Sequence, residues 1–120
     1  MKFFIFFIAL FLSSHTLAWH TASGKINAIN VYSETSTVLV TLVNNGVQVN
    51  GPAVPDCTST TTFAIDGSMP SDRRSQMVSI LLMAKAAGKT VRFSYSTGGG
   101  CVPYGNGRSV YRGIKRIILL

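Results

Sequence analysis

The residues that could carry acid–base, nucleophilic or metal chemistry are few and widely spaced. Beyond the first eighteen residues there is one histidine, His20, and the acids stand singly, at Glu34, Asp56, Asp66 and Asp72. A serine or cysteine triad needs a histidine held firmly by its fold, and His20 lies near a chain end that we expect to fray. Glycoside hydrolysis needs two convergent carboxylates, whereas three of these four occupy expected turns or a helix start. We therefore expect no enzyme, no catalytic residue, no metal site and no cofactor.

The N-terminus predicts export. Lys2 precedes an unbroken apolar run at residues 3–12, and a short polar stretch then ends at Ala18. This layout is typical of a secretory signal peptide, residues 1–18, cleaved after Ala18. The apolar run is too short for a membrane span, which needs about 20 residues. We expect a secreted or periplasmic protein with no membrane span after cleavage.

An exported chain is compatible with a disulfide. Cys57 and Cys101 are the only two cysteines, and paired cysteines are typical of oxidising compartments. We therefore expect a Cys57–Cys101 disulfide within a single domain, residues 19–120.

The charge of this domain favours anionic partners. It keeps ten of the eleven Lys and Arg residues against four acids, and ten minus four gives a formal charge of +6. Acidic glycans, lipopolysaccharide, phospholipid head groups and nucleic acid all match that sign. The basic residues are scattered, so a generally basic surface is the alternative to a dedicated patch.

The spacing of apolar and turn residues predicts a mainly β domain with one helix. Ser71 is expected to cap the helix, and Gly88 to end it. Strands are expected at 23–32, 37–43, 58–65, 89–96 and 110–120, with loops at 44–56 and 97–107. The order β-β-β-α-β-β is that of the five-stranded Greek-key barrel of the OB-fold, although a generic α+β sandwich shares it.

The expected helix is apolar on more than its core-facing stripe. Val78 and Leu82 fall outside the stripe, which makes them candidates for an interface between subunits. The alternative is a helix sunk deeply into a groove of its own domain.

Two classes of ligand suit an OB barrel, oligonucleotides and oligosaccharides. Nucleic acid requires aromatic platforms beside cations. Residues of those types are Tyr32, Phe93, Tyr95, Tyr104, Tyr111, Arg92, Arg108 and Arg112. Export argues against this class, and we expect no nucleic acid.

Sugar binding requires hydroxyl groups and an aromatic edge. Residues of those types are Ser23, residues 58–62, Tyr95 and Tyr104. The alternative is that these are ordinary strand-surface hydroxyls and half-buried tyrosines.

Three segments resemble secreted toxin subunits. Residues 23–26 with the following strand, and residues 82–95, are similar to the binding-subunit family of subtilase cytotoxin and typhoid toxin. Residues 100–104 and 114–119 resemble the more distant cholera-like enterotoxin binding subunits. The resemblance implies a secreted OB-fold that forms a homopentameric ring, binds cell-surface glycans and partners a toxic A subunit.

The resemblance also implies where the sugar binds. In the subtilase-type family, a serine in the first strand and a tyrosine after the helix contact a sialylated sugar, and Ser23 and Tyr95 match those places. Tyr104 is a third candidate. The single, differently spaced cysteine pair and the shorter tail depart from that family. The rival hypothesis is a monomeric periplasmic OB-fold that acts as an interaction or envelope protein.

Overall fold

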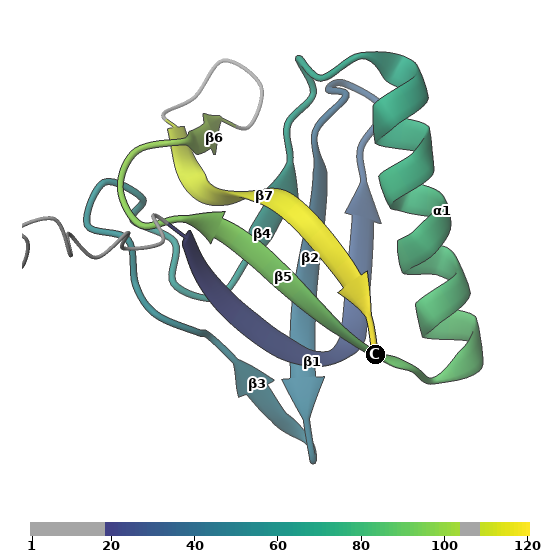
Figure 1. Ribbon diagram of the computed structural model, residues 1–120. Coiled ribbons are helices and arrows are strands. Elements are labelled where there is room, and N and C mark those ends of the chain that lie inside the picture. Colours follow the sequence, from purple (N-terminus) through teal and green to yellow (C-terminus); the bar gives the residue numbers. More distant parts are fainter. Residues whose placement is uncertain (1–18, 104–108) are drawn as a thin grey trace, which may run out of the picture.

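The computed structural model describes residues 19–103 and 109–120, and it confirms the expected class, mainly β with one helix (Figure 1). The predicted signal peptide, residues 1–18, lies outside the described residues. Within them, no helix is long and apolar enough to cross a membrane. The elements are β1 (Trp19–Val31), β2 (Val38–Asn44), β3 (Val47–Val49), β4 (Phe63–Ile65), α1 (Ser71–Ala87), β5 (Thr90–Ser96), β6 (Cys101–Pro103) and β7 (Ser109–Leu119).

Five of these strands are hydrogen bonded in a closed cycle. β1 is antiparallel to β2 and to β5, β2 is antiparallel to β4, and β5 is antiparallel to β7. A parallel pairing of β4 with β7 closes the cycle. β1 takes part twice because it is long: residues 19–25 pair with β5, and residues 25–31 pair with β2. A bulge between Ile26 and Ala28 lies just after the change of neighbour, where an extra residue lets a strand bend.

The expected loop after β2 contains a hairpin. Asn44 lies opposite Val47, so only Asn45 and Gly46 form the turn between β2 and β3. Both residues have left-handed backbone angles, with φ of 53° and 80°. A two-residue type I′ turn requires this geometry, and Asn-Gly is its strongest sequence signal.

Other predicted strand positions are wrong. β1 begins at Trp19 rather than Ser23, because its first residues pair with the end of β5. β4 begins at Phe63, and the threonine-rich residues 58–62 before it are not a strand. The glycine-rich loop contains β6, which pairs with β7. The described residues therefore hold seven strands rather than the five predicted.

The predicted end of the helix is confirmed and its predicted cap is not. Pro70 occupies the N-cap position, and no side chain caps the helix there. At the other end Gly88 is left-handed, with φ of 66°. α1 packs beside the sheet, as Figure 1 shows, and buries Leu81 and Ala84 completely.

A disulfide and an aromatic cluster stabilise the interior. Cys57 and Cys101 are bonded, as predicted, with their Cα atoms 5.5 Å apart. The disulfide is compatible with an extracytoplasmic protein. Phe63 lies in the core, and the centre of its ring is 5.3 Å from that of Phe93 and 5.3 Å from that of Tyr95, both in edge-on contact. These aromatic side chains are buried in the core, so they do not contribute to the outer face of β1 and β5.

Candidate functional site

The outer face of β1 and β5 carries polar and basic side chains in register. Every second residue of β1 from Ala22 to Ile26 is buried, so the residues between them face outward. Strand pairing then places Ser23 opposite Arg92, and Lys25 opposite Thr90. The guanidinium Nε of Arg92 donates a hydrogen bond to Ser23 Oγ over 3.1 Å.

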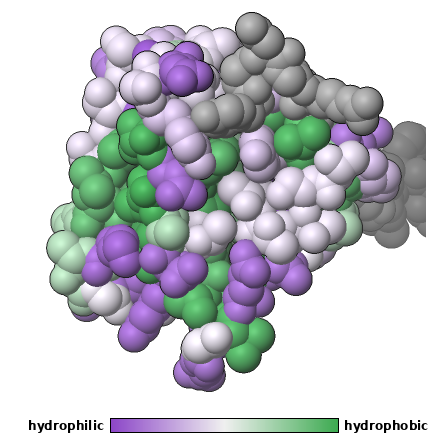
Figure 2. All heavy atoms as spheres, turned by 180° about the vertical axis from the view of Figure 1, so that it is seen from behind, coloured by the Kyte–Doolittle hydropathy of each residue, from purple (hydrophilic) through white to green (hydrophobic). Residues whose placement is uncertain are grey.

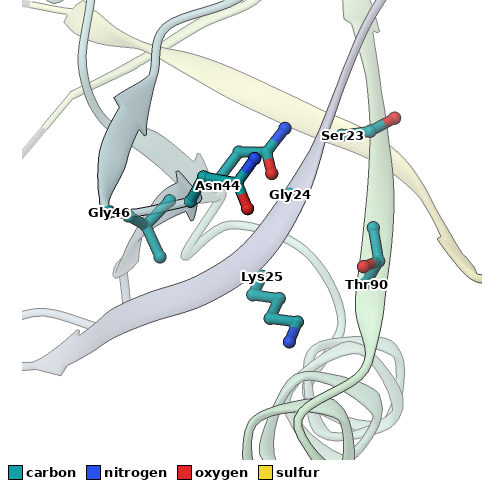
Figure 3. A pocket seen from close by; sticks show the side chains of 8 residues that line it. Ser23, Gly24, Lys25, Asn44, Gly46 and Thr90 are labelled. Carbon is teal, nitrogen blue, oxygen red and sulfur yellow. The ribbon is translucent and has the colours of Figure 1, made fainter.

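This face borders a pocket of about 450 Å³, which we call the Ser23 pocket. It lies where β1 turns away from β5 toward β2, and the β2–β3 turn forms its other wall. Figure 3 shows Ser23 and Thr90 on the neighbouring strands, Lys25 further along β1, and Asn44 at the end of β2. The lining residues are Ser23, Gly24, Lys25, Thr90, Val43, Asn44, Asn45 and Gly46.

The pocket is positively charged. Lys25 lines it and Arg92 lies beside it, both exposed to solvent. All four acids of the chain are elsewhere: Glu34 precedes β2, Asp56 accepts the Gly99 N–H, Asp66 accepts from Ser68, and Asp72 lies in the first turn of α1. The pocket therefore offers cations, hydroxyls and amides with no competing carboxylate. Such a set of groups suits an anionic, hydroxyl-rich ligand.

Tyr95 does not belong to this pocket, contrary to the sequence prediction. Its side chain is fully buried, and its hydroxyl donates to the Pro52 carbonyl over 2.7 Å. Strand alternation is the reason: Val91, Phe93 and Tyr95 share the core face of β5, while Arg92 faces outward. Ser23 and Tyr95 therefore lie on opposite faces of the sheet and do not form one site.

Tyr95 instead contacts a buried arginine. Arg112 is 1 % exposed, lies 4.1 Å from the centre of the Phe63 ring, and donates through Nη1 to the Asn50 and Pro52 carbonyls and to the Tyr95 hydroxyl. Its Nε and Nη2 have no hydrogen-bond partner within the described residues. Burial raises the pKa of the Tyr95 hydroxyl, and Arg112 opposes that rise. Burial lowers the pKa of the Arg112 guanidinium, and the Tyr95 hydroxyl opposes that fall.

The remaining predicted residues are dispersed. Tyr104 lies outside the described residues. Val78 is partly buried and packs against the core, whereas Leu82 is 55 % exposed. Of the residue types that a nucleic-acid surface would require, Phe93, Tyr95 and Arg112 are buried.

Sequence reasoning missed the cations of the site. Once Ser23 is taken as outward-facing, the period of two predicts that Lys25 shares its face. The same rule applied to β5 separates Arg92 from its apolar neighbours Val91 and Phe93. Asn44 and Thr90 had no comparable signal, because their places in the pocket depend on pairing between distant strands.

No cluster of three His, Cys, Asp or Glu side chains suitable for a metal ion occurs in residues 19–103 and 109–120. Comparisons with protein-family models, with curated proteins and with solved structures found no match for this chain.

Proposed function

We propose that this protein is an exported, non-catalytic OB-fold domain that binds acidic oligosaccharides at the Ser23 pocket. One observation carries the proposal: Arg92 and Lys25 flank a pocket lined by hydroxyls and amides, and none of the four acids of the chain lines it. A cell-surface glycan with a carboxylate, such as a sialylated one, has the complementary charge and hydroxyl groups.

The strand pairing supports the choice of fold class. β1, β2, β4, β7 and β5 follow one another around the closed cycle, and α1 lies between β4 and β5 in the chain. That arrangement matches the predicted barrel if β3 and β6 are additions to it. OB barrels commonly bind oligosaccharides or oligonucleotides.

The geometry of Arg92 supports a carboxylate as the bound group. Its Nε donates to Ser23, which holds the side chain against the sheet. Its other N–H groups form no hydrogen bond among the described residues, and a guanidinium can present two of them to one carboxylate. Lys25 adds a second cation, and Thr90 with Asn44 can hydrogen bond to sugar hydroxyls. Arg92 thus takes the place that the toxin resemblance gave to Tyr95.

A single open pocket of this kind binds weakly, so the proposal includes association of several copies, with a ring of five as the expected form. Leu82 and Met83 are 55 % and 52 % exposed on α1. Figure 2 shows apolar surface on the left of that view, where α1 lies. Joining several pockets raises avidity without new contacts. Native mass spectrometry tests this: a pentamer supports the ring, and a monomer instead favours the envelope-interaction hypothesis.

A glycan array tests the function. The purified, oxidised protein is applied to matched glycans that end in an acidic or a neutral sugar, and signal is expected on the acidic members. Arg92→Gln should abolish that signal. Arg73→Gln removes the same charge from the exposed start of α1 and should leave the signal unchanged. A folded protein that gives no signal on any acidic glycan would rule out the proposal.

A further inference from the structure

We propose that a second sugar-binding subsite, formed by Trp19 and Arg116, lies on the same face as the Ser23 pocket. The ligand is then an extended acidic oligosaccharide that runs along β1, rather than a single terminal sugar. This inference rests on the proposed function, because it identifies the length and shape of the ligand of that site.

Strand register places the two subsites on one face. Trp19 and Ser23 are four residues apart in β1, so both point outward, separated by about 13 Å at 3.3 Å per residue. Arg116 lies opposite Ser94 in the β5–β7 pair, and Ser94 lies opposite Thr21 in β1. The outward face therefore runs from Lys25 past Arg92 to Arg116 and Trp19, a length that one monosaccharide does not span.

Trp19 presents an exposed aromatic ring on this face. Its side chain is 44 % exposed, although an indole normally buries most of its surface. Its backbone is held by pairing with Ser96 at the end of β5. The guanidinium carbon of Arg116 lies 5.5 Å from the centre of the indole ring, which fixes the ring by a cation–π contact and places a cation beside it. A sugar ring can pack its apolar face on the indole while its carboxylate meets Arg116.

The composition of the face favours a glycan over single-stranded nucleic acid. Nucleic acid needs successive aromatic platforms, one for each base. On the described part of this face Trp19 is the only aromatic residue, and the outward side chains of β1 and β5 between it and Lys25 are serine, threonine and arginine. On β7, Ile118 lies opposite Arg92. The disulfide is also compatible with the extracytoplasmic space, where surface glycans are found.

The experiment uses Trp19 as its own reporter, because it is the single tryptophan of the chain. The protein is exported through its own leader, its N-terminus is read by mass spectrometry, and intrinsic fluorescence is titrated with sialic acid monomer and with α2-8-linked tetramer. We expect the tetramer, but not the monomer, to shift the emission. By calorimetry, Trp19→Ala should weaken tetramer binding about tenfold, the upper value for one aromatic contact, and leave monomer binding unchanged. Trp19→Phe should retain most of the affinity.

Each other outcome overturns the inference in a recognisable way. Tetramer that binds no more than fourfold tighter than monomer, with no effect of Trp19→Ala, rejects the second subsite and leaves the Ser23 pocket standing. Binding of neither sugar rejects both. Tighter binding of oligo(dT), weakening steeply with salt, identifies a nucleic-acid surface instead. A mature N-terminus beyond Trp19 removes the platform and rejects the subsite.

Discussion

Two arginines of this protein are each paired with a hydroxyl group, in opposite surroundings. Arg112 donates to the Tyr95 hydroxyl inside the closed cycle of strands, and Arg92 donates to the Ser23 hydroxyl on its outer face. The first pair is fully enclosed, whereas Arg92 is exposed beside an open pocket. The same chemical pair therefore serves the structure in one place and remains available to a ligand in the other.

The buried pair closes one end of the strand cycle. Arg112 donates to the carbonyls of Asn50 and Pro52, and Tyr95 donates to Pro52, so both hold the segment after β3 over the core. Gly51 is required there: its φ is 68°, and a Cβ at this position would lie 2.7 Å from the Tyr95 hydroxyl oxygen. Backbone carbonyls and the Phe63 ring take the place of a carboxylate partner for Arg112.

The outer pair has no such enclosure. Arg92 has one side-chain partner, Ser23, and its remaining N–H groups face solvent. An exposed cation of this kind adds little to stability, and its remaining N–H groups are accessible to a carboxylate. Substitutions should therefore affect stability in the buried region and binding in the outer one.

The largest effect is expected for the disulfide, which lies near the buried pair because Cys101 is opposite Arg112 in the β6–β7 pairing. Replacing both Cys57 and Cys101 by alanine should lower the free energy of unfolding by about 4 kcal/mol, because a loop of 44 residues loses its constraint in the unfolded chain. Urea unfolding monitored by circular dichroism measures this. An unchanged midpoint would show that the Arg112 contacts hold this end by themselves.

The two arginines themselves provide the sharpest test of the comparison. Arg112→Met should destabilise the fold by about 3 kcal/mol, because it leaves the carbonyls that Arg112 binds unpaired in the interior. Arg92→Met, the matched control, should change stability by less than about 0.5 kcal/mol and remove glycan binding. Equal losses of stability in the two variants would contradict the distinction.

A smaller effect is expected for the Tyr95 hydroxyl. Tyr95→Phe removes one buried hydrogen bond to Pro52 and should lower stability by about 1 to 2 kcal/mol. Under the original sequence prediction this variant should also lose sugar binding; under the present account it keeps it. Thermal unfolding and calorimetry of the same sample distinguish the two.

The same variant reveals a pH dependence. In the unfolded chain Tyr95 ionises near its ordinary pKa of 10.0, whereas burial raises the pKa in the fold. The stability it contributes is present below pH 10.0 and should fall as the pH rises through the raised pKa. The lowered pKa of Arg112 acts with the opposite sign, at higher pH. Urea midpoints between about pH 9 and pH 11 should therefore decline more steeply in the wild type than in Tyr95→Phe.

The smallest effect is expected for Ser23. Ser23→Ala removes the acceptor that orients Arg92 and should weaken glycan binding about fivefold, the equivalent of about 1 kcal/mol, with unchanged stability. Ser75→Ala, which removes an exposed hydroxyl from α1, is the control and should leave glycan binding unchanged. An equal loss of binding in Ser75→Ala and Ser23→Ala would contradict a role for the Ser23 hydroxyl.

Much of the fold could be predicted from local patterns. The run of β-branched residues at 37–43 indicates β2, and spacings of three and four indicate α1. Strands of three residues, such as β3 and β6, are too short to show a period. Their existence depends on partners far away in the chain, although Asn45-Gly46 did signal the turn before β3.

The candidate site was less accessible from sequence because it depends on which face of a strand is buried. Val91 and Phe93 already mark the core face of β5, and the same alternation places Tyr95 inside and Arg92 outside. Ser23 was predicted in the first strand, and the structure pairs it with Arg92 rather than with Tyr95; sugar binding by Ser23 stays a prediction. Trp19 was overlooked because a residue beside an expected cleavage site reads as a frayed end, whereas pairing with Ser96 makes it the first residue of β1.

Isothermal titration calorimetry of sialyllactose against lactose tests the central claim most directly. The two sugars differ by the acidic residue alone, and the comparison is made for the wild type and for Arg92→Gln. The account predicts that the wild type binds sialyllactose and not lactose, and that Arg92→Gln binds neither while unfolding at the same temperature. Equal affinity for the two sugars, or undiminished binding by Arg92→Gln, would contradict a carboxylate site at the Ser23 pocket.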